Sequence, residues 1–269
     1  MEVVLGVQFQ PLVGMHPGLL GAFWQGRRDK FPQVQQQPPL PHIVERKGGR
    51  ILPFPMLQFF GPSEQPRLWL ISGDNSELIQ LQSDRFLRNW RRYHGPTIEY
   101  PSYDNHTRPN FESDFEELLA FVKAERLPQP VIDQCEITYI NIILPCDVWR
   151  DFGDVSRVFN GLLCERRALK GAPITAVQWH TQHEISDSAG RFVGHLGFEL
   201  DSAFAAPPGS PPSGELSPAF QLQITVRGRP LSEGVKGVME FMDLGHAAIV
   251  KSFTEATTDE MHRAWGRTQ

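Results

Sequence analysis

Cysteine is scarce in this chain. The 269 residues include three cysteines, Cys135, Cys146 and Cys164, and no two of them are close in the sequence. An odd and sparse count does not fit a small secreted domain built on disulfides. Cys135 lies beside a strand-like apolar run, which predicts a buried thiol. This cysteine usage indicates a reducing, cytoplasmic compartment.

Long apolar runs are also missing. No run approaches the roughly 20 apolar residues that a membrane-spanning helix needs, so we expect no membrane partner. The first residues, MEVVLGVQFQP, alternate apolar positions and lack a basic stretch. This pattern predicts a strand and not a signal peptide.

The chain lacks the short motifs of several common enzyme classes. It contains no G-x-S-x-G, G-x-x-x-x-G-K-[ST], G-x-G-x-x-G, H-E-x-x-H or C-x-x-C. We therefore expect no cofactor, and binding is favoured over catalysis. The formal net charge of −5 argues against a general polyanion binder but allows a local basic site.

What the chain does contain is apolar periodicity that predicts an α+β fold in two halves, residues 1–130 and 131–269. In the first half, strands are expected at Val3–Phe9, Met56–Phe60, Arg67–Ser72 and Glu77–Gln82, and helices over 19–31 and 110–127. In the second half, strands are expected at Glu136–Leu144, Ile174–Glu184, Arg191–Leu200 and Phe220–Val226, and helices at Val155–Leu163 and Val235–Phe253.

Each half thus has the order β-α-β-β-β-α, which raises internal duplication as a hypothesis. Two such halves would share a curved antiparallel sheet with helices on one face. The other face, or a groove between helix pairs, would then be available for binding.

The densest basic and aromatic stretch is DRFLRNWRRYH, residues 84–94. A helix starting at Asp84 would turn Phe86 and Trp90 inward and place Arg85, Arg88 and Arg92 in an outer row. The expected binding residues are Arg85, Arg88, Arg91, Arg92 and Trp90. They would form the rim of a protein-binding surface or, alternatively, contact nucleic-acid phosphates and bases.

Histidines carry a third hypothesis, a metal- or His-dependent hydrolytic enzyme. His180 and His183 are three residues apart on a predicted strand, which places them on opposite faces. His195 lies on the next predicted strand and could neighbour one of them. Asp243 and His246 are at i, i+3 on the last long helix and could hydrogen-bond. The spacing alone predicts no metal site.

The C-terminal sequence predicts a short closing helix. Thr257 and Glu260 fit a capping box, so a helix should begin near Thr258. Met261 and Trp265 would dock this helix on the rest of the chain, and Gly266 would end it.

Several segments in order resemble a known family: EVVLGVQFQPL, GAFWQGRRDKFPQVQQQPPLP, ELIQLQSDRFLRNWRR, QCEITYINII and DLGHAAIVKSFTEATTDEMHRAWGR. The family is uncharacterised, prokaryotic and sporadically distributed, with members of about this length and an F-T-x-x-T-T-x-E-M-H-x-x-W-G tail. The resemblance spans Val3 to Arg267. The family's usual Pro-containing lead is missing before the first segment. The resemblance implies a mobile or defence-type gene neighbourhood. The missing catalytic motifs and the basic-aromatic segment favour a non-enzymatic binding protein, and the neighbourhood suggests a toxin or effector as its partner.

Overall fold

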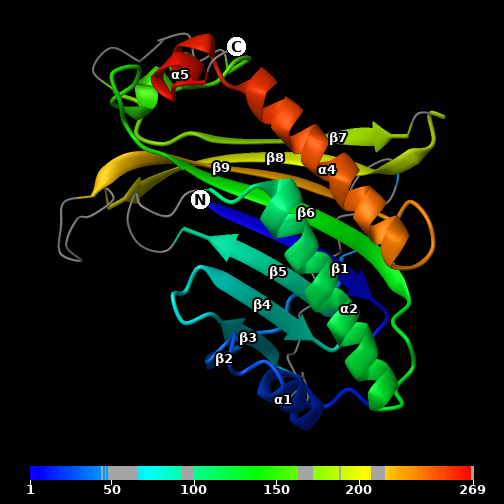
Figure 1. The fold of residues 1–269 in the computed structure, drawn as a ribbon. Coiled ribbons are helices and arrows are strands. Elements are labelled where there is room, and N and C mark those ends of the chain that lie inside the picture. Colours follow the sequence, from blue (N-terminus) through cyan, green and yellow to red (C-terminus); the bar gives the residue numbers. More distant parts are fainter. Residues whose placement is uncertain are drawn as a thin grey trace.

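The computed structural model describes most of the chain, namely residues 1–43, 45, 47, 66–92, 100–162, 172–187, 189–206 and 216–267. Within these ranges the strands form one antiparallel sheet of nine, in the order β2-β3-β4-β5-β1-β6-β9-β8-β7. Figure 1 shows this sheet with helices packed across it. The predicted α+β class and antiparallel sheet are confirmed.

The first half contributes five strands to one side of the sheet. Its elements are β1 (Glu2–Phe9), α1 (Pro17–Gln25), β2 (Gln33–Gln37), β3 (Arg67–Ile71), β4 (Glu77–Gln82), β5 (Arg85–Arg91), the π-helical turn η1 (Tyr103–Thr107) and α2 (Arg108–Ala124). The strand expected at Met56–Phe60 lies outside the described residues. The second half contributes β6 (Ile132–Ile143), the 3-10 turn η2 (Phe152–Asp154), α3 (Val155–Val158), β7 (Gln178–Ser186), β8 (Phe192–Ala205), β9 (Ser217–Gly228), α4 (Gly234–Ala256) and α5 (Asp259–Ala264).

The helix expected from Asp84 is wrong, because these residues form strand β5. β4 and β5 pair as a hairpin in which Gln82 lies opposite Arg85, so Asp84 belongs to the tight turn between them. Phe86 and Trp90, four residues apart, lie on the same side of a helix and also on the same face of a strand. Their spacing alone could not separate the two structures.

The central strands β1 and β6 pair with each other and join the two halves. Along one row, Arg88 lies opposite Leu5, Leu5 opposite Ile137, and Ile137 opposite Val226. Directly opposed residues share a face, so this row defines what we call the helix face. Helices α2 and α4 lie across it (Figure 1).

Two aromatic clusters fill the space beneath the helices. Under α2, the ring of Phe86 lies 5.7 Å from that of Phe115. At the far end of β9, the ring of Phe220 lies 4.6 Å from Trp149, which is fully buried. Cys135 is also buried, as predicted, and burial raises the pKa of its thiol above its usual value.

Short elements at the C-terminal end differ in detail from expectation. The helix expected at Val155–Leu163 is one turn, Val155–Val158. The closing helix is capped by Thr258 and not by Thr257, since the Thr258 side chain accepts from the Met261 N–H. Gly266 ends it with φ +68, as predicted. In the part of the chain described, no helix combines the length and apolarity that crossing a membrane requires.

Candidate binding face of the sheet

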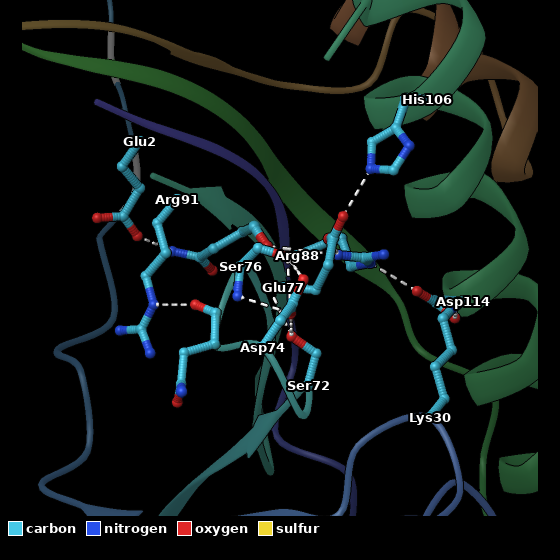
Figure 2. A network of polar contacts seen from close by, with 12 residues as sticks. Glu2, Lys30, Ser72, Asp74, Ser76, Glu77, Arg88, Arg91, His106 and Asp114 are labelled. Atoms are coloured by element: carbon cyan, nitrogen blue, oxygen red, sulfur yellow. Dashed lines mark hydrogen bonds and ion pairs between the residues drawn. The ribbon is translucent and has the colours of Figure 1, made fainter. Parts of the chain in front are cut away.

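The predicted arginines occupy different surroundings because β5 alternates between the two faces of the sheet. Arg88 points to the helix face and is 3% exposed. Its Nε donates to Asp114 of α2 at 2.6 Å, and its Nη1 contacts Glu77 of β4. Asp114 also pairs with Lys30, and Glu77 lies 2.6 Å from His106 Nε2. Figure 2 shows this arrangement. Arg88 is therefore the centre of a buried ionic network within its own chain.

Arg85 points to the opposite face and is also buried. Its Nη2 donates to the Pro41 carbonyl at 2.7 Å and contacts the Gln8 side chain. Burial lowers the pKa of its guanidinium, although Glu136 and Asp84 oppose that shift.

The other three predicted binding residues do not form one surface with Arg85 and Arg88. Trp90 is 4% exposed, with its ring 5.6 Å from that of Tyr100. Arg91 is half-buried and donates to the Asn75 carbonyl at 2.9 Å, whereas Arg92 is exposed. The expected outer row of Arg85, Arg88 and Arg92 is therefore wrong, and a binding role for these residues stays a prediction.

The face opposite the helices, here called the polar face, is covered over the first half by the extended residues 38–43. Gln82 accepts from the Leu40 N–H at 2.8 Å and donates to the Leu40 carbonyl at 3.0 Å. Gln8 does the same with Ile43, at 3.0 and 2.7 Å. Each glutamine amide thus satisfies a backbone donor and a backbone acceptor, as a neighbouring strand would.

Over the second half, a single side chain, Glu45, joins several polar residues of this face. Its carboxylate accepts a hydrogen bond involving His195 Nδ1 at 2.9 Å and lies 3.5 Å from Arg227 Nη1. Arg227 also pairs with Glu136 at 2.6 Å. Burial alone would lower the pKa of Arg227, but the two carboxylates outweigh it and the pKa is raised.

A small polar pocket of about 70 Å³ opens beside this network on β7, β8 and β9. It is lined by Glu45, His180, Gln182, His195, Gly197, Glu199, Gln223, Thr225 and Arg227. Gly197 leaves open space in it, because a Cβ there would meet nothing nearer than the Thr225 carbonyl at 3.9 Å. All the other lining residues have polar side chains.

The charge on this part of the face is unbalanced. By strand alternation from the register, its carboxylates are Glu45, Glu136, Glu184, Glu199 and Asp201. Among the described residues of β6 to β9, Arg227 is the one guanidinium on this face. His180 and Glu199 lie 3.6 Å apart with side chains 61% and 47% exposed. The arrangement favours a cationic ligand.

The structure separates the histidines as the strand pattern predicts. His180 lies opposite Glu199 on the polar face, and His183 lies opposite Leu196 on the helix face. His195 lies on the polar face, opposite Glu184. In the described ranges, no group of three or more His, Cys, Asp or Glu is arranged to hold a metal ion.

Asp243 and His246 form a second polar cluster that joins the helices. Asp243 accepts from the Tyr103 hydroxyl at 2.9 Å and from Arg108 Nε at 2.8 Å. His246 stacks on Tyr103, with ring centroids 3.9 Å apart, and bonds the Tyr139 hydroxyl at 2.8 Å. Burial lowers the pKa of His246 and raises that of Tyr103. These contacts give the cluster a structural role between α4, η1 and α2.

The pocket residues outside the histidines were not anticipated. One signal was present, since Gln221, Gln223, Thr225 and Arg227 stand at every second position of an otherwise apolar strand. Glu45 gave no such signal, because it lies in a loop and meets His195, 150 positions away in the chain.

Comparison with known proteins does not bear on this site. A scan against protein-family models, a search of curated proteins and a search of solved structures each found no match. The family resemblance noted in the sequence stays a prediction, and function has to be argued from the geometry.

Proposed function

We propose that this chain is a non-enzymatic binding protein whose partner docks on the polar face of β7, β8 and β9, at the pocket around Gly197. The observation that carries the proposal is an exposed, acid-rich sheet face with a floor left open by a glycine. Helices cover the opposite face, so the exposed polar side chains here are not used for packing.

The charge indicates the partner's chemistry. Carboxylates outnumber the guanidinium of Arg227, so a lysine- or arginine-rich protein segment is attracted to this face. A nucleic-acid backbone is repelled by the same groups. The arginines that would have contacted phosphates are largely unsuited to it, since Arg85 and Arg88 are buried. The family resemblance adds a toxin or effector as the expected partner, in the cytoplasm.

A second candidate is His-dependent hydrolysis, favoured by the bond between His195 and Glu45, because a carboxylate can orient an imidazole as a general base. The His195 side chain is only 4% exposed, which restricts its access to a substrate. Binding therefore stays the better-supported function.

The test uses a fluorescent decalysine peptide, with decaglutamate and oligo-dT as negative probes, followed by anisotropy. Gly197→Val should fill the pocket without a backbone clash, and Glu199→Lys should reverse one exposed charge. Each should weaken peptide binding about tenfold, equivalent to about 1.4 kcal/mol. The control, Glu255→Lys, makes the same charge change on α4 and should leave binding nearly unchanged.

The same variants should be used as baits in the native host. A stoichiometric protein recovered with the wild type and with Glu255→Lys, but not with Gly197→Val, would support the proposal. Equal peptide binding by wild type and both face variants would refute it, as would binding of oligo-dT in preference to the peptide.

A further inference from the structure

Strand β7 forms one edge of the sheet. It pairs with β8 on one side, and its other side has no partner strand in the described part of the chain. In an edge strand, alternate backbone N–H and C=O groups point outward and can pair with another strand. β7 offers nine residues, QWHTQHEIS, in which no position is buried.

The two edges of the sheet differ in how they discourage pairing. β2 at the opposite edge has only five residues and runs directly into Pro38 and Pro39, and proline cannot donate to a ladder. β7 contains no proline and no lysine, and is nearly twice as long. Apart from the charge of Glu184 and a register shift between Ile185 and Ser186 near its end, β7 lacks the usual protections of an edge strand.

The sequence of β7 is complementary to itself when two copies run antiparallel about Gln182. In that register, each His180 lies opposite Glu184 of the second copy, and each Trp179 lies opposite Ile185 of the second copy. Thr181 lies opposite His183 of the second copy, and the two Gln182 residues lie opposite each other. The imidazole of His180 can hydrogen-bond the Glu184 carboxylate opposite it, and cross-strand pairs of this kind stabilise antiparallel ladders.

The faces of the sheet agree with this register. His180 and Glu184 both lie on the polar face, so an imidazole would lie opposite a carboxylate there twice. Trp179 and Ile185 lie on the helix face, partly buried against the core. Pairing would extend that apolar layer across the junction, which removes partly exposed apolar surface from water.

We propose that two copies of this protein associate through their β7 edges, antiparallel and centred on Gln182. The two sheets then become one continuous sheet. Both polar faces lie on the same side, with a Gly197 pocket on each flank of the junction. This inference goes beyond the proposed function and does not depend on it, since it concerns pairing along the backbone edge of β7, although His180 and Gln182 also line the pocket.

The dimer is expected to depend on concentration. An interface made by two short edge strands is at the small end of stable interfaces, below about 1,200 Å². Sedimentation equilibrium over a wide range of protein concentration should therefore show a monomer–dimer equilibrium. A monomer at every concentration would overturn the proposal.

Charge variants test the register. Glu184→Lys places a lysine opposite His180 at both ends and should raise the dimer dissociation constant about tenfold. The double variant His180→Glu with Glu184→Lys places a carboxylate opposite each lysine and should recover the dimer. Glu255→Lys is the matched control on a distant exposed helix position. If Glu184→Lys dimerises as the wild type does, the register is refuted.

A cysteine at the two-fold position gives an independent result. In an antiparallel pair the opposed Cα atoms are about 4.5–5.5 Å apart, which is within disulfide range. Gln182→Cys should form a covalent dimer under mild oxidation, whereas Gln178→Cys, at the end of the strand, should not. Wild-type protein oxidised in parallel controls for the native cysteines. Crosslinking of both variants alike, or of neither, would argue against pairing centred on Gln182.

Discussion

The two long helices rest on the sheet in different ways at matching positions. In the row Arg88–Leu5–Ile137–Val226, the outer residues belong to β5 and β9, on either side of the central strands. Under α2, the outer residue is a buried arginine that pairs with Asp114. Under α4, a Cβ at Gly245 would lie 2.4 Å from Ile137 and 3.4 Å from Val226.

The difference separates two means of fixing a helix on a sheet. The arginine acts as a polar spacer, and its charge is balanced by carboxylates from α2 and β4. Gly245 has no side chain, so the α4 backbone can approach the apolar surface of the sheet closely. The first contact should be sensitive to loss of a charge, and the second to addition of a methyl group.

The largest effect is expected at the polar contact. Arg88→Ala leaves Asp114 and Glu77 without their shared guanidinium in a buried position. Removing one partner of a buried ion pair typically costs about 3–5 kcal/mol. Urea unfolding should show this loss as a lower midpoint.

Arg92→Ala is the matched control, because Arg92 is a neighbouring arginine that is exposed. It should change the free energy of unfolding by no more than about 0.5 kcal/mol. Similar losses for both substitutions would mean that the buried network does not hold α2 in place.

The second largest effect is expected at the apolar contact between Gly245 and the sheet. Gly245→Ala forces a methyl group against Ile137, and overpacking of this kind costs about 1–3 kcal/mol. Gly21→Ala is the control, since a Cβ at Gly21 in α1 meets nothing within 4 Å. There the helix propensity of alanine should raise stability by about 0.5–1 kcal/mol. If thermal unfolding shows that Gly245→Ala lowers stability while Gly21→Ala raises it, the close approach of α4 to the sheet is established. A stabilising Gly245→Ala would contradict it.

Loss of the polar contacts of Asp243, which join α4 to η1 and α2, should reduce stability less. Asp243→Ala removes the acceptor of the buried Tyr103 hydroxyl and of Arg108. Because Asp243 is itself about half exposed, we expect a loss near 1 kcal/mol. Glu255→Ala removes one partner of an exposed ion pair on the same helix. It should change the free energy of unfolding by only a few tenths of a kcal/mol. Equal effects would show that the joint adds nothing.

The smallest effect is a pH dependence at His246. Burial holds its pKa below the ordinary value of 6.5, although Asp104 and Asp243 oppose that shift. The unfolded chain therefore binds the proton more readily, so stability is full above pH 6.5 and falls as pH drops toward the folded-state pKa. Chemical unfolding of wild type and His246→Asn over about pH 5 to 8, a range that brackets the ordinary histidine pKa, should show a shallower slope of stability against pH for the variant. An unchanged slope would assign the dependence to other groups.

Much of the secondary structure could be predicted from local pattern. The strands expected at Arg67–Ser72 and Glu77–Gln82 match β3 and β4, and Asn75 in the turn between them adopts φ 61. Strand alternation also placed His180 and His183 on opposite faces. β5 was misassigned because the spacing of Phe86 and Trp90 fits a helix as well as a strand, and only pairing with β4 and β1 decides between them.

The candidate site was less accessible to sequence reasoning. A polar residue at every second position predicts a polar face, but not which polar residues are covered. Gln8 and Gln82 are buried by residues 38–43, whereas Gln182 remains exposed. This difference depends on where a distant segment crosses the sheet.

By itself the sequence determined most of the strands, the long helices and the alternation of faces, because these follow from local sterics and apolar periodicity. Tertiary structure alone decided which arginine is buried and which carboxylates surround the pocket. Arg88 meets Asp114 across 26 positions of the chain, and Glu45 meets His195 across 150. Contacts of that range arise only when the sheet and helices assemble, since no local pattern records which charge will lie opposite another.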